Sequence, residues 1–279
     1  MSVNAPPTFL MCPPDFFGVE YVINPWMEGQ EGSVVSPVAQ SQWNGLYELL
    51  TGTLGARVHL LAPKPGLPDM VFTANAALVR GAICVPARLR PVERRGEEPH
   101  YEEWFRTKGF VLREPPAHTF FEGAGDALFG QEEDGTPLLW CAHGFRSDRA
   151  AQRFLGETLD IETVLLRLMD PRFYHLDTCF CPLPGGYLLW FPDAFDRNSV
   201  QEVVRRVPAD RRHAVSEADA IEFACNAVAV SSTEIVLHQA SDPLKAWLRE
   251  RGWTTRETPL TEFLKSGGSA KCLTLRLDG

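Results

Sequence analysis

Seven cysteines and seven histidines are among the side chains of this sequence that could attack a carbon atom or move a proton. Cys272 follows the segment Gly267-Gly-Ser-Ala-Lys271 and precedes an apolar run. A glycine pair allows backbone conformations that expose a side chain, and a neighbouring ammonium favours the thiolate. This setting predicts a reactive thiol; the alternative is a cysteine that packs as a small apolar residue.

The segment His175-Leu-Asp177 places an imidazole and a carboxylate two residues apart. If the segment is a strand, both side chains point to the same face and can act together. We therefore predict a proton-transfer role for His175, against the alternative that it is a structural histidine.

Two carboxylates surround small residues in Glu122-Gly-Ala-Gly-Asp126. Glycines permit close approach of a ligand to the backbone. Two ionised carboxylates that face one pocket repel each other unless a cation lies between them. The segment favours a cation-binding pocket, with an acidic turn as the alternative.

Cys179 and Cys181 form a Cys-x-Cys pair close to His175. A zinc site would need a second pair of ligands at suitable spacing, and the sequence has none. We predict that the two thiols pack in the core and that the protein needs no metal. Cys12, Cys84, Cys141 and Cys225 also have the apolar surroundings of structural cysteines.

The same sequence pattern, a polar residue followed by an apolar segment that we predict as a strand, recurs along the chain. The key residues are Asn75, Asp126, Asp177, Asn226 and Cys272, at spacings of 51, 51, 49 and 46 residues. A repeat of about fifty residues indicates an architecture built from similar units. The alternative is that Asn and Asp are simply common where strands begin.

Each unit also has a segment with helical spacing. We predict helices over Pro37–Leu54, Tyr101–Lys108, Asp148–Leu159, Arg197–Val207 and Asp242–Gly252. Asp148, Asp196 and Asp242 stand at predicted N-cap positions. The unit is then strand, strand, helix, strand, and its radial repetition predicts an α/β fold, a five-unit β/α propeller (pentein) with pseudo-fivefold symmetry, as one domain over residues 1–279.

In such a ring the equivalent residues of all units meet at the axis. The five key residues would therefore gather at one place. Polar groups are costly to bury unless they bind something. The repeat thus predicts a polar binding site at the hub.

The bulk composition limits the kinds of partner. The chain has 279 residues, 44% apolar content and a net charge of -9, which argues against a nucleic-acid binder but allows a small cationic ligand. No apolar run is long enough to span a bilayer, and residues 1–7 do not resemble a secretory signal. An odd number of scattered cysteines suits a reducing cytoplasm. The oligomeric state stays open, a homo-oligomer included.

Together these motifs resemble a known superfamily. Phe72-Thr-Ala-Asn75, Phe121-Glu-Gly-Ala-Gly-Asp126, Gly144-Phe-Arg146, His175-Leu-Asp177 and Gly267-Gly-Ser-Ala-Lys-Cys272 look like those of the guanidino-group-modifying enzymes. That superfamily includes arginine deiminases, dimethylarginine dimethylaminohydrolases and amidinotransferases. Met11-Cys-Pro-Pro-Asp and Tyr21-Val-Ile-Asn24-Pro-Trp-Met look closest to its arginine dihydrolase branch. The resemblance runs from about Leu10 to Leu277.

The resemblance implies a five-unit propeller and a role for each matching residue. It implies Cys272 as nucleophile, His175 as general acid and base, and Glu122 as the partner of that histidine. Asp126 and Asp177 would lie near the guanidinium group of the substrate. It also implies that Arg146 and Arg94 hold the substrate carboxylate, that Asn24 lines the site, and that no cofactor is needed.

Asn75 decides between the branches, because deiminases resemble this chain but carry aspartate there, whereas the dihydrolase branch has asparagine. We expect hydrolysis of arginine to ornithine, ammonia and carbon dioxide through a covalent thiouronium. The alternatives are an arginine deiminase, a dimethylarginine dimethylaminohydrolase, an amidinotransferase, a propeller that binds without catalysis, and a metal or redox protein.

Overall fold

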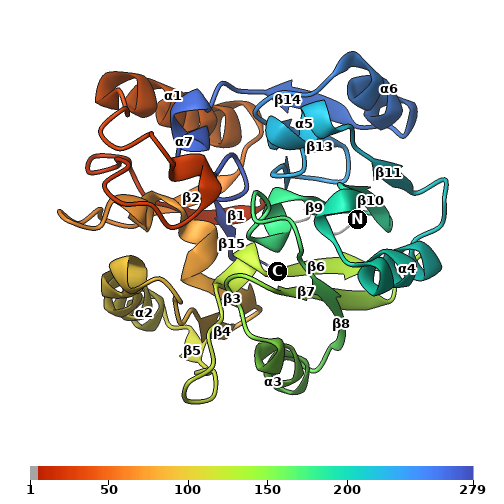
Figure 1. The fold of residues 1–279 in the computed structure, drawn as a ribbon, viewed down its shortest axis with the longest axis horizontal. Helices are drawn as coiled ribbons and strands as arrows, with labels where there is room; N and C mark the ends of the chain where they lie inside the picture. The colour runs from red at the N-terminus through yellow and green to blue at the C-terminus, as the bar shows by residue number, and fades with distance from the viewer. Residues whose placement is uncertain (1–5, 279) are drawn as a thin grey trace.

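Five three-stranded sheets make up a mixed α/β fold in the computed structural model, which describes residues 6–278. In each sheet an inner strand pairs antiparallel with a middle strand, and the middle strand pairs parallel with an outer strand. The sheets follow one another around the molecule (Figure 1). The expected repetition of one unit is therefore present in the strand connectivity.

The strands fall into three sets of five. The inner strands are β3 (Ala77–Arg80), β6 (Ala127–Gln131), β9 (Phe180–Leu183), β12 (Val228–Ala229) and β15 (Leu275–Arg276). The middle strands are β1 (Thr8–Met11), β4 (Ile83–Pro86), β7 (Pro137–His143), β10 (Tyr187–Trp190) and β13 (Glu234–Leu237). The outer strands are β2 (Arg57–Leu60), β5 (Val111–Leu112), β8 (Glu162–Arg167), β11 (Arg212–Ala214) and β14 (Thr254–Glu257).

A helix connects the middle and outer strand of every sheet, because parallel neighbours need a long crossover. These helices are α1 (Ser36–Glu48), α2 (Glu98–Thr107), α3 (Arg149–Leu159), α4 (Arg197–Arg206) and α6 (Asp242–Glu250), and they lie at the periphery (Figure 1). Two further short α-helices, α5 (Glu217–Ile221) and α7 (Thr261–Leu264), lie outside these crossovers. The predicted order strand, strand, helix, strand is confirmed.

The helix predicted over Pro37–Leu54 is divided in the structure. The α-helical part ends at Glu48, and Leu49–Thr53 forms a π-helical turn. The other four predicted helices agree with the observed ones to within three residues at each end.

Helix capping differs from the prediction at two of three sites. Asp196 caps α4, since its side chain accepts a hydrogen bond from the backbone N–H of Ser199. Asp148 stands at the N-cap position of α3, but its carboxylate binds Arg90 instead of the helix. At α6 the cap is Ser241, one residue before the predicted Asp242. A hydroxyl at the correct position competes well with a carboxylate one residue later.

The two ends of the described chain meet in one sheet. Strand β1 pairs with β15, with Leu10 opposite Leu275, and the backbone N–H of Leu277 donates to the carbonyl of Thr8. The last sheet is thus built from both ends of the chain. The expectation that residues 1–7 form no secretory signal concerns a segment of which residues 1–5 lie outside the described part.

Apolar side chains fill the space between sheets and helices. Middle strand β7 is buried over Leu138–Ala142, as expected for a strand covered on both faces. On α6, Leu244 and Leu248 lie one turn apart and both are fully buried. No helix in the described range is long and apolar enough to cross a membrane.

Candidate active site

Several of the predicted site residues lie in or next to short turns that precede the inner strands. Asn75 lies in a 3₁₀ turn over Thr73–Ala76, immediately before β3, and Cys272 lies in the turn before β15. A 3₁₀ turn over Gly123–Gly125 separates Glu122 from Asp126. A Cβ atom at Gly125 would collide with Asn75 and approach the His175 ring. Glycine at this position therefore lets three turns approach each other closely.

His175 and Asp177 do not lie on a strand, so the prediction that they share a strand face was wrong. His175 precedes a 3₁₀ turn over Leu176–Thr178, and the turn sends the two side chains to different partners. His175 contacts Glu122, whereas Asp177 contacts Cys272. A buried polar pair two residues apart does not by itself distinguish a turn from a strand.

Glu122 forms the centre of a buried charge network. Its Oε2 lies 2.7 Å from His175 Nε2 and accepts a hydrogen bond of 3.1 Å from Arg146 Nη1. The backbone N–H of Arg90 donates to Oε1 at 3.0 Å. Burial opposes ionisation, but Arg146 and His175 outweigh it and hold the pKa of Glu122 well below its usual range. Glu122 is therefore an anion that fixes the orientation of the imidazole.

Asp126 connects the turn before β6 to the turn that carries His175. Its Oδ2 accepts hydrogen bonds from the Ser147 hydroxyl at 2.6 Å and backbone at 3.1 Å, and Oδ1 accepts from the Leu176 backbone at 3.1 Å. Burial raises the pKa of Asp126. The carboxylate was expected near the substrate guanidinium, but its oxygens are occupied by the protein.

Cys272 is 3% exposed, so the predicted exposure of this thiol was wrong. The side chain of Asn226 holds its position: Nδ2 donates to Sγ at 3.1 Å, and Oδ1 accepts from the Cys272 backbone at 3.1 Å. Burial, and then the nearby Asp177 carboxylate, raise the pKa of Cys272 well above its usual value. Without a cation beside it, the sulfur is a thiol.

Asp177 lies beside the sulfur. Its Oδ2 is 3.5 Å from Cys272 Sγ, and its Oδ1 is buried without a hydrogen-bond partner among the described residues. Burial raises the pKa of Asp177 to about 6, although His175 and Lys271 oppose the shift. A buried, unpaired carboxylate oxygen next to a thiol is a place where an N–H donor or a cation would be stabilised.

A small cavity joins the sulfur to the arginines. Its volume is about 10 Å³, which is roughly the room for one water molecule. The lining residues are Ile23, Asn24, Met27, Asp69, Phe72, Asn75, Arg94, Arg146, Tyr174, Ser266, Gly268 and Cys272. Four of the predicted site residues, and Cys272 itself, therefore border one space. A larger ligand requires the lining to move apart.

The two predicted arginines differ in how many donors remain free. Arg94 uses four of its five N–H groups, in two bonds to Glu97, one to Asn75 Oδ1 and one to a backbone carbonyl. Arg146 uses only two, to Glu122 and to the carbonyl of Ile23, and its guanidinium lies 4.6 Å from the centre of the Tyr174 ring. Arg146 is therefore the better anchor for an anionic group.

Asn24 supports the wall of the cavity. Its Oδ1 accepts from the Trp26 backbone at 3.0 Å, and its Nδ2 donates to the carbonyl of Ser266 at 3.1 Å. The amide thus joins the segment near Trp26 to the glycine loop before Cys272.

Two residues of the site were missed as candidates. Asn226 was recognised as a repeat position but not as a partner of the thiol. Asp69 lines the cavity, accepts from the Tyr21 hydroxyl at 2.9 Å, and has its Oδ1 buried without a partner among the described residues. An aspartate directly before the apolar run Met70–Phe72 is the signal that could have identified it.

Cys179 and Cys181 are buried, and each thiol contacts backbone carbonyls. Across residues 6–278, no group of three or more His, Cys, Asp or Glu side chains is placed to hold a metal ion. The two thiols pack in the core, as predicted.

The sequence and the fold match known proteins over nearly the whole length of this chain. The family described as N,N dimethylarginine dimethylhydrolase, eukaryotic, matches residues 22–277. The chain therefore belongs to the dimethylarginine dimethylhydrolase family. It is 38% identical over 268 residues to an uncharacterized protein, ZK1307.1, of Caenorhabditis elegans, of which it covers 92%.

Two relatives carry more specific descriptions. The bifunctional arginine dihydrolase/ornithine cyclodeaminase AgrE of Nostoc sp. is 52% identical over 96% of this chain, and the chain spans 37% of its length. The N(G),N(G)-dimethylarginine dimethylaminohydrolase of Mycobacterium tuberculosis is 38% identical, with 85% of its length covered.

A solved structure covers the same extent as this chain. The N-terminal domain of ArgZ, described as an arginine dihydrolase from cyanobacteria bound to substrate, superposes with a TM-score of 0.93 at 50% identity. The match covers 98% of both chains.

Proposed function

We propose that this chain is a cysteine-dependent hydrolase that converts arginine to ornithine, two ammonia and carbon dioxide. The proposal is supported by identity of 51–52% to two bifunctional cyanobacterial arginine dihydrolases over 96% of the chain. Because the chain spans 37% of those relatives, the proposal concerns their dihydrolase activity alone. A variant of the ArgZ N-terminal domain covalently bound to a reaction intermediate supports covalent chemistry for this fold.

The fold that supports this activity is proposed to be a five-unit β/α propeller with pseudo-fivefold symmetry. The five sheets have the same strand connectivity, and the turns before their inner strands carry Asn75, Asp126, Asp177, Asn226 and Cys272. A radial arrangement accounts for the contacts between these turns, since each unit then presents the same turn to the hub.

In the first half-reaction the proposed nucleophile is the Cys272 thiolate, which attacks the guanidinium carbon. The cationic guanidinium would lie beside Asp177 and lower the pKa of the neighbouring thiol, since an opposite charge favours the charged form. Asp177 Oδ1 accepts an N–H of the substrate and fixes its plane against the sulfur. His175 donates a proton to the departing ammonia, which leaves a covalent thiouronium.

Water then attacks the thiouronium carbon while His175 takes one of its protons, and the thiol is released with citrulline. The Glu122 carboxylate stabilises the imidazolium that forms in each proton transfer. Arg146 is proposed to hold the substrate carboxylate together with Arg94, and Arg146 is the main anchor because more of its donors remain free. Asp69 Oδ1 is an acceptor for the substrate ammonium, and Asn24 and Asp126 keep the surrounding turns in position.

In the second half-reaction the sulfur attacks the ureido carbon of bound citrulline. A second ammonia leaves, and water hydrolyses the resulting thiocarbamate to a carbamate that loses carbon dioxide and yields ornithine. Two waters are consumed for the two ammonia and one carbon dioxide released, so the atoms balance.

We expect the orientation of the Asn75 side chain to determine whether ornithine or citrulline is the product. Arg94 Nη1 donates to Asn75 Oδ1 at 2.9 Å, so the Nδ2 group must point the other way and can donate. Nδ2 makes one bond, of 3.3 Å, to the carbonyl of Glu122, and its second N–H remains available for a ureido oxygen. A carboxylate at this position would repel that oxygen and favour release of citrulline.

Mass spectrometry of the products from arginine, citrulline, agmatine and dimethylarginine tests the proposal. We expect ornithine and ammonia from arginine in a ratio of 1:2, and mainly citrulline from N75D. The control is N44D on the exposed face of α1, which should behave as the native protein. Citrulline that accumulates without ornithine in the native protein would contradict the dihydrolase and favour a deiminase.

A second candidate is hydrolysis of dimethylarginine, which is favoured by the family match and by the relative from Mycobacterium tuberculosis. Dimethylamine released from dimethylarginine, with arginine left unchanged, would identify this activity in the same experiment. For either activity, the seven unpaired thiols suit a reducing cytoplasm. The proposed partner is a small cationic substrate, with no nucleic acid and no membrane.

A further inference from the structure

The larger cavity of the molecule lies away from the sulfur. It has a volume of about 360 Å³ and is bordered by residues of all five inner strands. None of its lining residues also lines the small cavity at Cys272. Its size falls in the range of pockets that hold small molecules. We call it the axial cavity.

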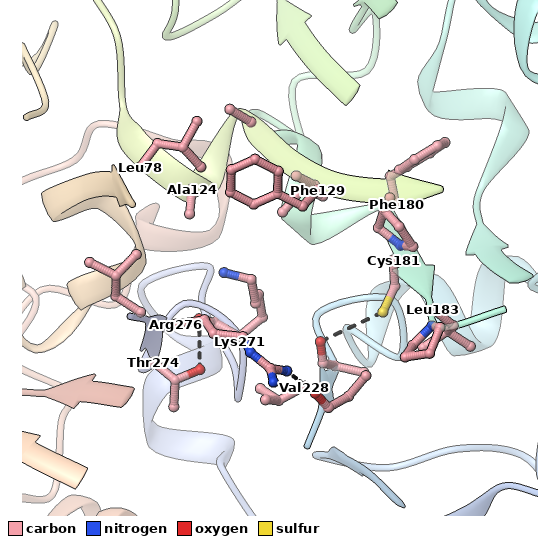
Figure 2. A pocket seen from close by; sticks show the side chains of 18 of the residues that line it. Leu78, Ala124, Phe129, Phe180, Cys181, Leu183, Val228, Lys271, Thr274 and Arg276 are labelled. Atoms are coloured by element: carbon pink, nitrogen blue, oxygen red, sulfur yellow. Dashed lines mark hydrogen bonds between the residues drawn. The ribbon is translucent and has the colours of Figure 1, made fainter. Parts of the chain in front are cut away.

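Carbon atoms form most of its wall. Leu78, Phe129, Phe180 and Val228 face it from four different strands (Figure 2). Three of these are less than 7% exposed, and Phe129 is half-buried. When the apolar part of a ligand packs on such a surface, burial contributes a free energy of roughly 25 cal/mol for each Å² of apolar surface removed from water.

One cation in this wall has no partner. The side chain of Lys271 reaches into the axial cavity, and no dashed line meets its nitrogen (Figure 2). Within residues 6–278 the bonds of Lys271 are made by its backbone, whose N–H donates to the carbonyl of Asn226 and whose carbonyl accepts from the Thr274 hydroxyl, and its ammonium makes none. Burial lowers the pKa of Lys271, although Asp177 opposes this shift. Lys271 is half-buried, so its ammonium reaches the open space of the cavity, where an anion can pair with it.

The other charges of the wall are already paired. Arg276 donates to both carboxylate oxygens of Asp278 at 3.2 Å, and to the carbonyl of Ala229 at 3.0 Å. Among the lining residues that the structure describes, Asp278 is the only one with a carboxylate side chain. A cationic ligand therefore finds no free anion here, and a ligand with two negative charges finds only one free cation.

We propose that the axial cavity binds a small aliphatic monocarboxylate, whose carboxylate pairs with Lys271 and whose chain packs on Leu78, Phe129 and Val228. The geometry requires a single negative charge and an apolar body. This site is separate from the catalytic cavity and does not depend on the proposed reaction.

Isothermal titration of the full chain with hexanoate and with 1-hexanol tests the proposal. We expect one hexanoate for each chain, bound at least tenfold more tightly than the neutral hexanol. K271M keeps the aliphatic stem and removes the charge, so it should weaken hexanoate at least tenfold and leave hexanol unchanged. K245M removes a lysine from α6, outside the cavity, and should bind hexanoate as the native protein does. Equal affinity for hexanoate and hexanol would overturn the proposal.

The arginines of the catalytic cavity could also attract a carboxylate. The variant R146M therefore distinguishes hexanoate binding at the catalytic cavity from binding at the axial cavity. Loss of hexanoate binding in R146M together with its retention in K271M would assign the carboxylate to the catalytic cavity and refute the axial site. Nuclear Overhauser contacts between hexanoate and the Val228 methyl groups of the native protein give an independent readout. Saturable binding without these contacts would refute the site even if a variant failed to fold.

Discussion

At the scale of single residues, the arrangement around Cys272 explains how a buried thiol can serve as a nucleophile. The sulfur is buried and has a carboxylate 3.5 Å away, and both raise the pKa of the thiol more than Asn226 and Lys271 lower it, so the neutral thiol is favoured. A guanidinium group between sulfur and carboxylate would reverse this preference. The substrate would thereby activate the group that attacks it, and other electrophiles would meet an unreactive thiol.

Asp177 should make arginine binding dependent on pH. Its pKa is raised to about 6, so the carboxylate is ionised above that pH and neutral below it. The cation is attracted only by the ionised form. We therefore expect the KM for arginine to rise as the pH falls through about 6, by up to about tenfold for each further unit.

Steady-state kinetics between about pH 5 and pH 8 measure this effect. In D177N the KM should be high throughout and nearly independent of pH in this range. The matched variant D134N removes an exposed aspartate and should keep the native profile. A native KM that stays constant down to pH 5 would show that Asp177 does not hold the guanidinium.

At the scale of elements, the repeat of key residues predicted the order of strands and helices because each unit is a local feature of the sequence. Every key residue lies within three residues of an inner strand, and the helices begin where amphipathic spacing begins. The predictions failed for side chains whose hydrogen-bond partners come from distant segments of the chain. Nothing near Asp148 in sequence indicates that Arg90 binds its carboxylate, and nothing near Arg94 indicates its bond to Asn75.

The same limit applies to the candidate site. Residue types and repeat spacing identified Cys272, His175 and Glu122, which the structure places in adjoining buried networks. They did not predict that Asp126 binds Ser147, because that contact depends on how the turns pack in space. Asp69 was missed for the same reason.

The N-cap of α6 provides a stability test at this scale. Ser241 Oγ accepts from the Leu244 backbone and donates to Asp219 Oδ2 at 2.8 Å. S241A removes both bonds, and we expect a loss of about 1–2 kcal/mol in the free energy of unfolding. D242A, one residue later, removes a side chain that is 97% exposed and should change stability by less than about 0.5 kcal/mol.

Urea denaturation followed by circular dichroism measures both variants. A larger loss in D242A than in S241A would show that Asp242 supplies the cap of α6, as the sequence suggested. The α4 variant D196A provides a positive control, since its cap is made by the aspartate itself.

At the scale of the whole molecule, the sheet that contains β15, β1 and β2 joins the two ends of the described chain. Phe9 lies opposite Arg276, and the backbone N–H of Thr8 donates to Asp278 Oδ1 at 2.9 Å. Cys272 lies in the turn that leads into this sheet. The position of the proposed nucleophile therefore depends on a sheet whose strands come from opposite ends of the described chain.

This closure predicts that the chain tolerates new ends if the old ones are joined. A linker of about six Gly and Ser residues, with a reach of up to about 20 Å, can connect Pro6 to Asp278. The new ends belong between Asp134 and Gly135, in the exposed turn between β6 and β7. Exposed turns tolerate such cuts because little buried backbone is disturbed.

We expect this permuted chain to unfold cooperatively and to hydrolyse arginine within about threefold of the native rate, since every sheet and every site residue keeps its neighbours. The matched control opens the chain between Trp140 and Cys141, in the buried middle strand β7, and should fail to fold. Thermal unfolding and product analysis on both chains check the prediction. If the first permuted chain folded but left Cys272 unreactive, a continuous link between β6 and β7 would be needed to position this residue. That result would contradict the prediction.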